Sequence, residues 1–144
     1  MFFTKIAKIV VVFLFMALSS VEVDARGNGG VNFDWNPLMD AITEVESGGD
    51  ARATNGGCCG AMQISTICVR ECNVILQSRG EKKRYTLKDR FNVKKSREMF
   101  VLIMSKYNPT NNIELAIRLW NGGVHYSVRA TQHYYQKVMA QLKK

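Results

Sequence analysis

The sequence contains no long hydrophobic run. The longest, residues 9–18, has ten residues, about half of what an α-helix needs to cross a bilayer. Lys5 and Lys8 precede this run and a small-residue cleavage signal ending at Ala25 follows it, which is typical of a secretory signal peptide over residues 1–25. No cysteine lies near that position, so we expect no lipid anchor. We expect an exported protein, periplasmic or extracellular, with an uncleaved anchor as the alternative.

Acidic residues are few: the chain has 12 Asp and Glu against 20 Lys and Arg, a net charge of +8. Removal of the leader takes away two of each sign, so a mature chain of 119 residues keeps this charge. Between residues 79 and 97 only two acidic side chains accompany nine basic ones, which are Arg79, Lys82, Lys83, Arg84, Lys88, Arg90, Lys94, Lys95 and Arg97. Such a segment can bind polyanions. Because an exported protein rarely meets nucleic acid, we expect anionic wall polymers as partners and no nucleic acid; a solvent-exposed face is the alternative.

Cysteine is also scarce, and the four cysteines fall within fifteen residues, at Cys58, Cys59, Cys68 and Cys72. In an oxidising compartment the default state of such thiols is the disulfide. Adjacent cysteines can hardly bridge each other without strain, so we expect one or two links from Cys58 and Cys59 to Cys68 and Cys72, with the connectivity open. A zinc site that includes the two histidines is the alternative, but the spacing matches no common zinc motif. We expect no metal and no cofactor.

Only two prolines are present, and each marks a helix boundary. Asn36-Pro37 starts a helix over residues 37–47 that a Gly-Gly pair ends. Asn108-Pro109 ends a second helix, over residues 92–107. Apolar side chains share one face of each predicted helix, so both are expected to pack on a common core.

Internal repeats and low-complexity tracts are absent, which favours a single domain. Periodicity predicts three further helices, over residues 64–76, 113–120 and 128–142. Residues 79–90 are expected to be irregular or a short hairpin. The sequence therefore predicts one small, mainly α domain over residues 34–144, braced by disulfides, after a flexible lead over residues 26–33.

One carboxylate is out of place on the first predicted helix. At about 100° per residue, Glu46 falls in the apolar arc between Met39 and Ile42, whereas Asp40 and Glu44 fall on the polar side. Partial burial disfavours the charged form and raises the pKa of a carboxyl group, which is what a general acid requires. A side chain that simply bends out to water is the alternative.

Four motifs follow one another along the chain. An ES pair (Glu46-Ser47) ends a helix, GCCGAMQI occupies residues 57–64, RLWNGG occupies residues 118–123, and T-x-x-Y ends at Tyr134. In order and spacing they resemble the ES, GAxGLMQI, AYNAG and T-x-x-Y-V motifs of the lytic transglycosylase catalytic domain. That family has a lysozyme-like fold, of the goose-type and transglycosylase kind, and cleaves peptidoglycan glycan strands. The resemblance runs from about residue 34 to residue 138.

The resemblance implies a role for each matching residue. Glu46 becomes the catalytic acid and base, and the implied substrate-binding residues are Ser47, Met62, Gln63, Trp120, Asn121 and Tyr134. Amide side chains can bind sugar hydroxyls and acetamides, and a tyrosine can hydrogen-bond the carboxyl group. The alternatives are purely structural: a core methionine, a helix-capping asparagine and a tyrosine that satisfies a buried partner. Two positions depart from the family pattern, since Trp120 replaces a tyrosine and Cys58-Cys59 replaces a small pair.

The number of carboxylates decides the reaction. Hydrolases of glycosides normally use two, whereas the resemblance implies that Glu46 alone breaks the MurNAc–GlcNAc β-1,4 bond and closes a 1,6-anhydro ring. If Asp50 reaches across the cleft, a lysozyme-type hydrolase is the alternative. A non-catalytic wall-binding or assembly protein is another, and a cationic membrane toxin is disfavoured because no mature segment is suitably amphipathic. We expect a monomer that acts on peptidoglycan, in wall turnover, phage entry or exit, or beside a secretion or conjugation machine.

Overall fold

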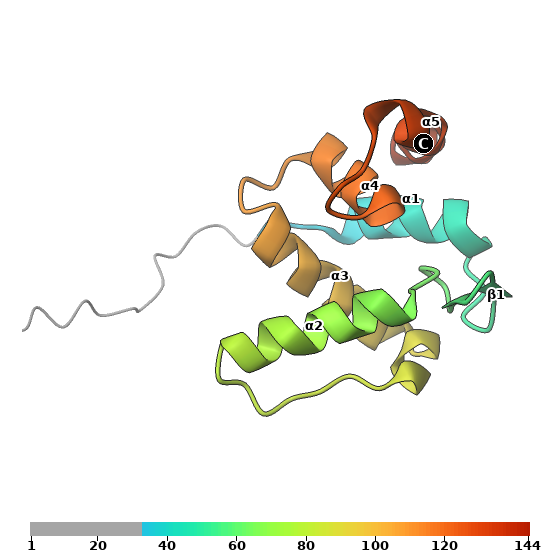
Figure 1. Cartoon of the computed structure of the whole chain (residues 1–144). Helices are drawn as coiled ribbons and strands as arrows, with labels where there is room; N and C mark the ends of the chain where they lie inside the picture. Colours follow the sequence, from blue (N-terminus) through green and yellow to red (C-terminus); the bar gives the residue numbers. More distant parts are fainter. Residues whose placement is uncertain (1–32) are drawn as a thin grey trace, which may run out of the picture. The chain divides into compact units, whose positions relative to one another are not determined.

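The computed structural model describes residues 33–144, which form one compact unit (Figure 1). The predicted signal peptide and residues 26–32 of the predicted lead lie outside the described residues. The elements follow in the order α1 (Asn36–Ser47), β1 (Thr54–Asn55), β2 (Cys58–Cys59), α2 (Thr66–Ser78), the 3-10 helix η1 (Leu87–Phe91), α3 (Val93–Tyr107), α4 (Ile113–Gly122) and α5 (Val128–Leu142). The predicted small, mainly α domain is confirmed, and none of these helices is long and apolar enough to cross a membrane.

Local signals in the sequence explain where the helices begin and end. Asn92 caps α3, because its side chain accepts a hydrogen bond from the Lys95 amide. Ser65 caps α2 in the same way, through the Cys68 amide, so α2 starts two residues later than periodicity predicted. No hairpin forms over residues 79–90. Their last part continues instead into η1, which a reciprocal pair of hydrogen bonds between Thr86 and Asp89 caps.

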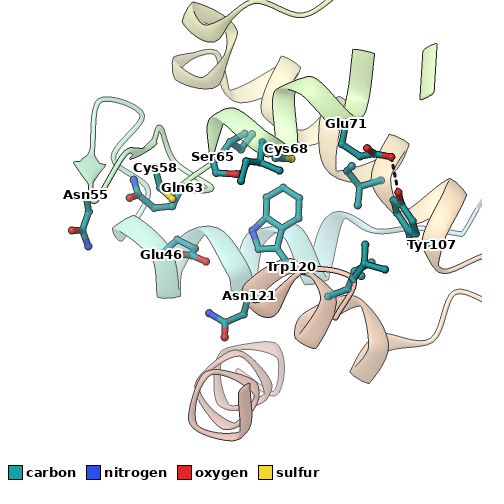
Figure 2. A pocket seen from close by; sticks show the side chains of 16 residues that line it. Glu46, Asn55, Cys58, Gln63, Ser65, Cys68, Glu71, Tyr107, Trp120 and Asn121 are labelled. Atoms are coloured by element: carbon teal, nitrogen blue, oxygen red, sulfur yellow. Dashed lines mark hydrogen bonds between the residues drawn. The ribbon is translucent and has the colours of Figure 1, made fainter. Parts of the chain in front are cut away.

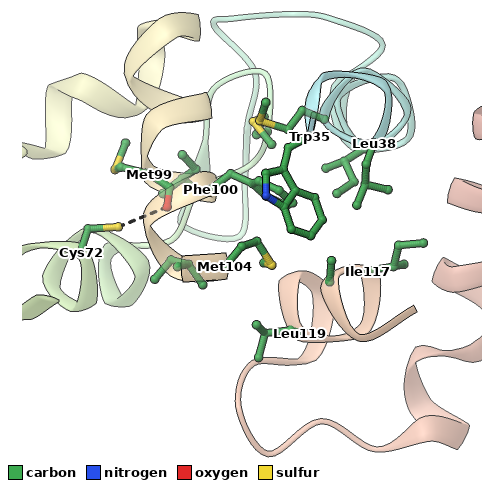
Figure 3. Close-up of a cluster of buried hydrophobic side chains, with 14 of the residues drawn as sticks. Trp35, Leu38, Cys72, Met99, Phe100, Met104, Ile117 and Leu119 are labelled. Atoms are coloured by element: carbon green, nitrogen blue, oxygen red, sulfur yellow. Dashed lines mark hydrogen bonds between the residues drawn. The ribbon is translucent and has the colours of Figure 1, made fainter. Parts of the chain in front are cut away.

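The helices form two groups joined by aromatic packing. Helices α1 and α4 both pack on α5, while α2 and η1 pack on α3. The fully buried Phe100 of α3 connects the groups, with its ring 5.6 Å from Trp35 and 5.0 Å from Trp120. Figure 3 shows Phe100 among Trp35, Leu38 and other core side chains. This packing holds α1 and α4 against the α2–α3 pair.

The predicted disulfide brace is wrong for residues 33–144, where Cys58, Cys59, Cys68 and Cys72 are all free thiols. Cys58 and Cys59 are neighbours on β2, so their side chains leave opposite faces of the strand. Cys68 and Cys72 lie one turn apart on α2, and the Cys72 thiol donates to the Met99 carbonyl at 3.7 Å. The Cys72 pKa is raised by its hydrogen bond with Cys68 and by burial. Core packing, and not cross-linking, holds this region.

Candidate active site

A groove of about 510 Å³ runs between the two helix groups (Figure 2). Its walls come from the end of α1, the β1–β2 segment, α2, α3, and the end of α4 with the loop that follows it. The lining residues are Glu46, Asn55, Cys58, Gln63, Ile64, Ser65, Ile67, Cys68, Glu71, Ile103, Tyr107, Leu119, Trp120, Asn121, Gly123 and Val124. Three of the four sequence motifs therefore contribute a side chain to one concave surface.

Glu46 enters this groove from the last turn of α1. Its Oε1 accepts a hydrogen bond of 2.7 Å from the Tyr134 hydroxyl of α5. Burial raises the pKa of Glu46, and the hydrogen bond from Tyr134 offsets part of that rise. Burial, together with the nearby Glu46 charge, raises the pKa of Tyr134, so its hydroxyl keeps the proton that it donates. The partial desolvation predicted from the helical wheel is confirmed.

Ser47 and Met62 do not line the groove, although the resemblance implied that both bind substrate. The Ser47 hydroxyl donates to the Ala61 carbonyl at 2.8 Å, which ties the end of α1 to the 57–64 segment. Met62 is 1% exposed and lies in the core. Its backbone carbonyl accepts a 3.3 Å hydrogen bond from the Trp120 indole N–H. Both residues therefore connect the segments that form the groove walls, and neither side chain lies on the groove surface.

Gln63, Trp120 and Asn121 do line the groove. Gln63 has φ +50, an unusual conformation for a residue with a side chain. Its amide nitrogen donates to the Gly60 carbonyl at 2.8 Å and the Ala53 carbonyl at 3.2 Å, so the side chain is fixed before any ligand binds. Trp120 packs on Phe100 and stays half-buried, and its ring forms part of the groove wall (Figure 2). An aromatic surface beside the fixed Gln63 amide suits a sugar ring.

Asp50 is not a second carboxylate of the groove. It is exposed in the turn after α1, and its Oδ1 accepts a hydrogen bond from the Arg52 amide at 2.8 Å. The carboxylate that shares the groove with Glu46 is Glu71 of α2, which sequence reasoning missed. The Tyr107 hydroxyl and the Lys106 ammonium each donate to Glu71 Oε1 at 2.6 Å. These two bonds lower the pKa of Glu71, with Lys106 the larger cause, so Glu71 stays ionised.

The position of Tyr134 depends on a buried cation that sequence reasoning also missed. Arg118 of α4 is 3% exposed and donates to the Glu114 carboxylate, the Thr131 hydroxyl and the Gln132 amide oxygen. Its guanidinium also lies 4.5 Å from the centre of the Tyr135 ring. These contacts tie α4 to the first turns of α5 and so fix the helix that carries Tyr134.

Gly122, in the RLWNGG motif, is required by a close approach. A Cβ at this position would lie 2.6 Å from the Tyr126 Cβ and 2.9 Å from the Thr131 Cγ2. Glycine therefore lets the loop after α4 fold back tightly onto α5. Asn121, just before this turn, lines the groove, and Tyr134 of α5 donates its hydrogen bond to Glu46.

Within residues 33–144, no group of three or more His, Cys, Asp or Glu side chains is arranged to hold a metal ion. Comparison of the chain with protein-family models, with curated protein sequences and with solved structures found no match. The groove itself offers a partly desolvated carboxyl group, the phenol that binds it, the fixed Gln63 amide and an indole ring.

Proposed function

We propose that the chain is an exported enzyme of lysozyme-like fold that cleaves peptidoglycan by lytic transglycosylation. Glu46 acts as the only acid and base, and the bond that breaks joins MurNAc to GlcNAc. The observation that carries this proposal is the partly buried Glu46 carboxyl group, hydrogen-bonded to Tyr134 and open to a groove with fixed polar side chains. The raised pKa suits the first step, in which the group must hold a proton.

The reaction needs two proton transfers, one from Glu46 to the substrate and one from the substrate back to Glu46. Protonated Glu46 donates to the glycosidic oxygen, the C1–O bond breaks, and its electron pair stays with the leaving oxygen. The substrate's acetamide stabilises the cationic C1 centre. The Glu46 carboxylate then takes the proton of the sugar's 6-hydroxyl, whose oxygen bonds to C1 and closes the 1,6-anhydro ring. Glu46 ends protonated, ready for another cycle, and water is not consumed.

Tyr134 supports the charged stage of this cycle. Its hydroxyl donates to Glu46 Oε1 and accepts nothing from it, because a carboxylate has no proton to give. The bond therefore strengthens when Glu46 is ionised, and it orients the carboxyl group for both transfers. Burial of the carboxyl group outweighs this hydrogen bond, so the net effect of the surroundings on the pKa of Glu46 is still a rise.

The placement of the other carboxylates favours transglycosylation over hydrolysis. An inverting hydrolase needs a second carboxylate that activates water across the cleft. Asp50 lies outside the groove. Glu71 is held by Tyr107 and Lys106, and in Figure 2 the Trp120 ring lies between it and Glu46. Neither side chain is available beside the Glu46 carboxyl group.

Digestion of purified sacculi tests the proposal. The expected soluble products carry anhydro ends, which borohydride cannot reduce, and mass spectrometry identifies them directly. Reducible ends would make the protein a hydrolase. Tight binding to sacculi without any released glycan would make it a wall-binding protein, the non-enzymatic alternative.

The basic segment carries fewer available charges than its sequence suggests. Arg90 is buried and donates to the backbone carbonyls of Gly57 and Ile64. Lys83, Lys95 and Arg97 form ion pairs with Glu98, Asp89 and Asp40. The cations of the segment that have no hydrogen-bond or ion-pair partner within residues 33–144 are Lys82, Lys88 and Lys94. We propose that these three lysines, called the free lysines below, contact the anionic wall polymers.

Replacing the three free lysines with glutamine should weaken sacculus binding roughly tenfold at low salt, since an exposed charge contact contributes about 0.5 kcal/mol. The difference from the parent should shrink as salt screens the contacts. Co-sedimentation with sacculi measures both effects. The matched control is Lys137, Lys143 and Lys144 replaced by glutamine, which removes the same charge elsewhere. Equal weakening in both triple variants would mean that only net charge matters.

A further inference from the structure

The groove has two chemically different halves. Around Glu46 the wall carries amide side chains, including Gln63 and Asn121. On the other side of the Trp120 ring lie Glu71 and Tyr107 (Figure 2). Ile67 is one turn from Glu71 on α2, and Ile103 is one turn from Tyr107 on α3, so each isoleucine lines this second part of the groove beside its polar neighbour. We call this part the apolar half.

The apolar half offers a sugar few hydrogen-bond partners. Every hydroxyl of a pyranose ring needs a hydrogen-bond partner when it leaves water. Apart from Glu71 and Tyr107, the walls of this half offer isoleucine side chains, and Ile67 is 71% exposed although it is large and apolar. Val124, from the loop after α4, lines the same groove and is 53% exposed. Exposed apolar side chains that line one cavity are suited to cover small apolar groups of a ligand.

Glu71 supplies the charged group of this half. Both of its hydrogen bonds, from Tyr107 and Lys106, go to Oε1, and Oε2 has no partner within residues 33–144. The two bonds fix the carboxylate, and its side chain remains 30% exposed. A fixed carboxylate oxygen without a partner accepts a hydrogen bond from an N–H group. The ligand of this half therefore combines small apolar groups with an N–H donor.

We infer that the apolar half binds the stem peptide attached to the glycan, with its methyl side chains against Ile67 and Ile103 and a peptide N–H on Glu71 Oε2. This inference rests on the proposed function and narrows it, because the preferred substrate becomes peptide-bearing glycan and not bare glycan. The half is continuous with the catalytic half, so one substrate molecule reaches both. A fatty acyl chain fits less well, since it would leave the Glu71 carboxylate without a donor.

Calorimetric titration of the exported protein with two soluble fragments tests the inference: a disaccharide that carries its tetrapeptide, and the same disaccharide without it. The parent should bind the peptide-bearing fragment about tenfold more tightly. Glu71→Gln and Ile67→Ser should each reduce that preference to threefold or less and leave binding of the bare fragment unchanged. The matched controls, Glu81→Gln and Val74→Ser, change exposed side chains outside the groove and should keep the full preference.

Two outcomes would overturn the inference: equal affinity of the parent for both fragments, or equal losses in the groove variants and their controls. Cleavage assays separate this failure from failure of the proposed function. If sacculi are cleaved at the same rate before and after an amidase removes their peptides, the proposed activity is supported and the inferred peptide site is contradicted. If neither form is cleaved, the proposed function fails, and the titrations still report on the peptide site.

Discussion

Glu46→Gln should reduce the release of soluble glycan from sacculi by at least about 1,000-fold. Glutamine keeps the shape of the side chain and still accepts the Tyr134 hydrogen bond, but it has no proton to donate to the glycosidic oxygen. The loss is large because the same carboxyl group serves both proton transfers, so neither step has a substitute nearby. Release rates measured by chromatography of soluble products report the effect.

Thermal unfolding provides the control for this variant. Because burial raises the pKa of Glu46 above its ordinary value of 4.5, the folded parent binds the proton more tightly than the unfolded chain does. The parent therefore loses stability as pH rises through that raised pKa, whereas glutamine does not titrate. The Tm of the variant relative to the parent should increase between about pH 4 and about pH 7. An inactive variant with a lower Tm at neutral pH would point to misfolding, and retained cleavage would remove Glu46 from the mechanism.

The helices and Glu46 could be predicted because their signals are local. Prolines, glycines and capping asparagines act within one helical turn, so the ends of α1 and α3 were found to within a residue. Glu46 was found because its angle on its own helix placed it among apolar residues. Periodicity reports that angle faithfully, and the core lies on the side that most apolar residues face.

The remaining parts depend on contacts between distant segments. Glu71 lies on the side of α2 that lines the groove, and no sequence signal near it indicates that Tyr107 and Lys106 are its partners. Arg118 was read only as part of a motif, although it is buried and bonds to a helix ten or more residues away. A motif match also cannot separate a side chain that faces the ligand from one that supports it, which is why Ser47 and Met62 were misplaced.

The charge of the basic segment illustrates the same limit. Nine basic residues in nineteen positions predicted a segment that binds polyanions, but their number does not show which of them have partners in the fold. The partners of Lys83 and Arg97 lie beyond the segment, on Glu98 and Asp40, and Arg90 turns inward to bind backbone carbonyls. Of the nine basic residues, only the three free lysines therefore keep a charge that is available for a polyanion.

Gly60 occupies the most constrained backbone position in the groove wall. It has φ +82, and a Cβ there would lie 1.8 Å from the Arg90 carbonyl oxygen and 2.8 Å from its carbonyl carbon. Since both atoms belong to the backbone of η1, no side chain can move aside. Gly57 has a similar φ of +86, but its Cβ would meet no atom within 4 Å. The two glycines thus have similar backbone conformations, but only Gly60 lacks room for a Cβ.

Alanine at both positions separates the two costs. Gly57→Ala should lower the free energy of unfolding by about 1–2 kcal/mol, the cost of a left-handed residue with a Cβ, whereas Gly60→Ala should lower it by about 4 kcal/mol, because η1 must also be displaced. Urea unfolding measures both. Glycan release should fall more in Gly60→Ala than in Gly57→Ala. The segment from Gly60 to Gln63 accepts the Ser47 and Trp120 hydrogen bonds that hold α1 and the indole in place. Equal destabilisation by the two alanines would mean that η1 yields to a Cβ at Gly60, and the close approach of η1 would then not constrain this segment of the wall.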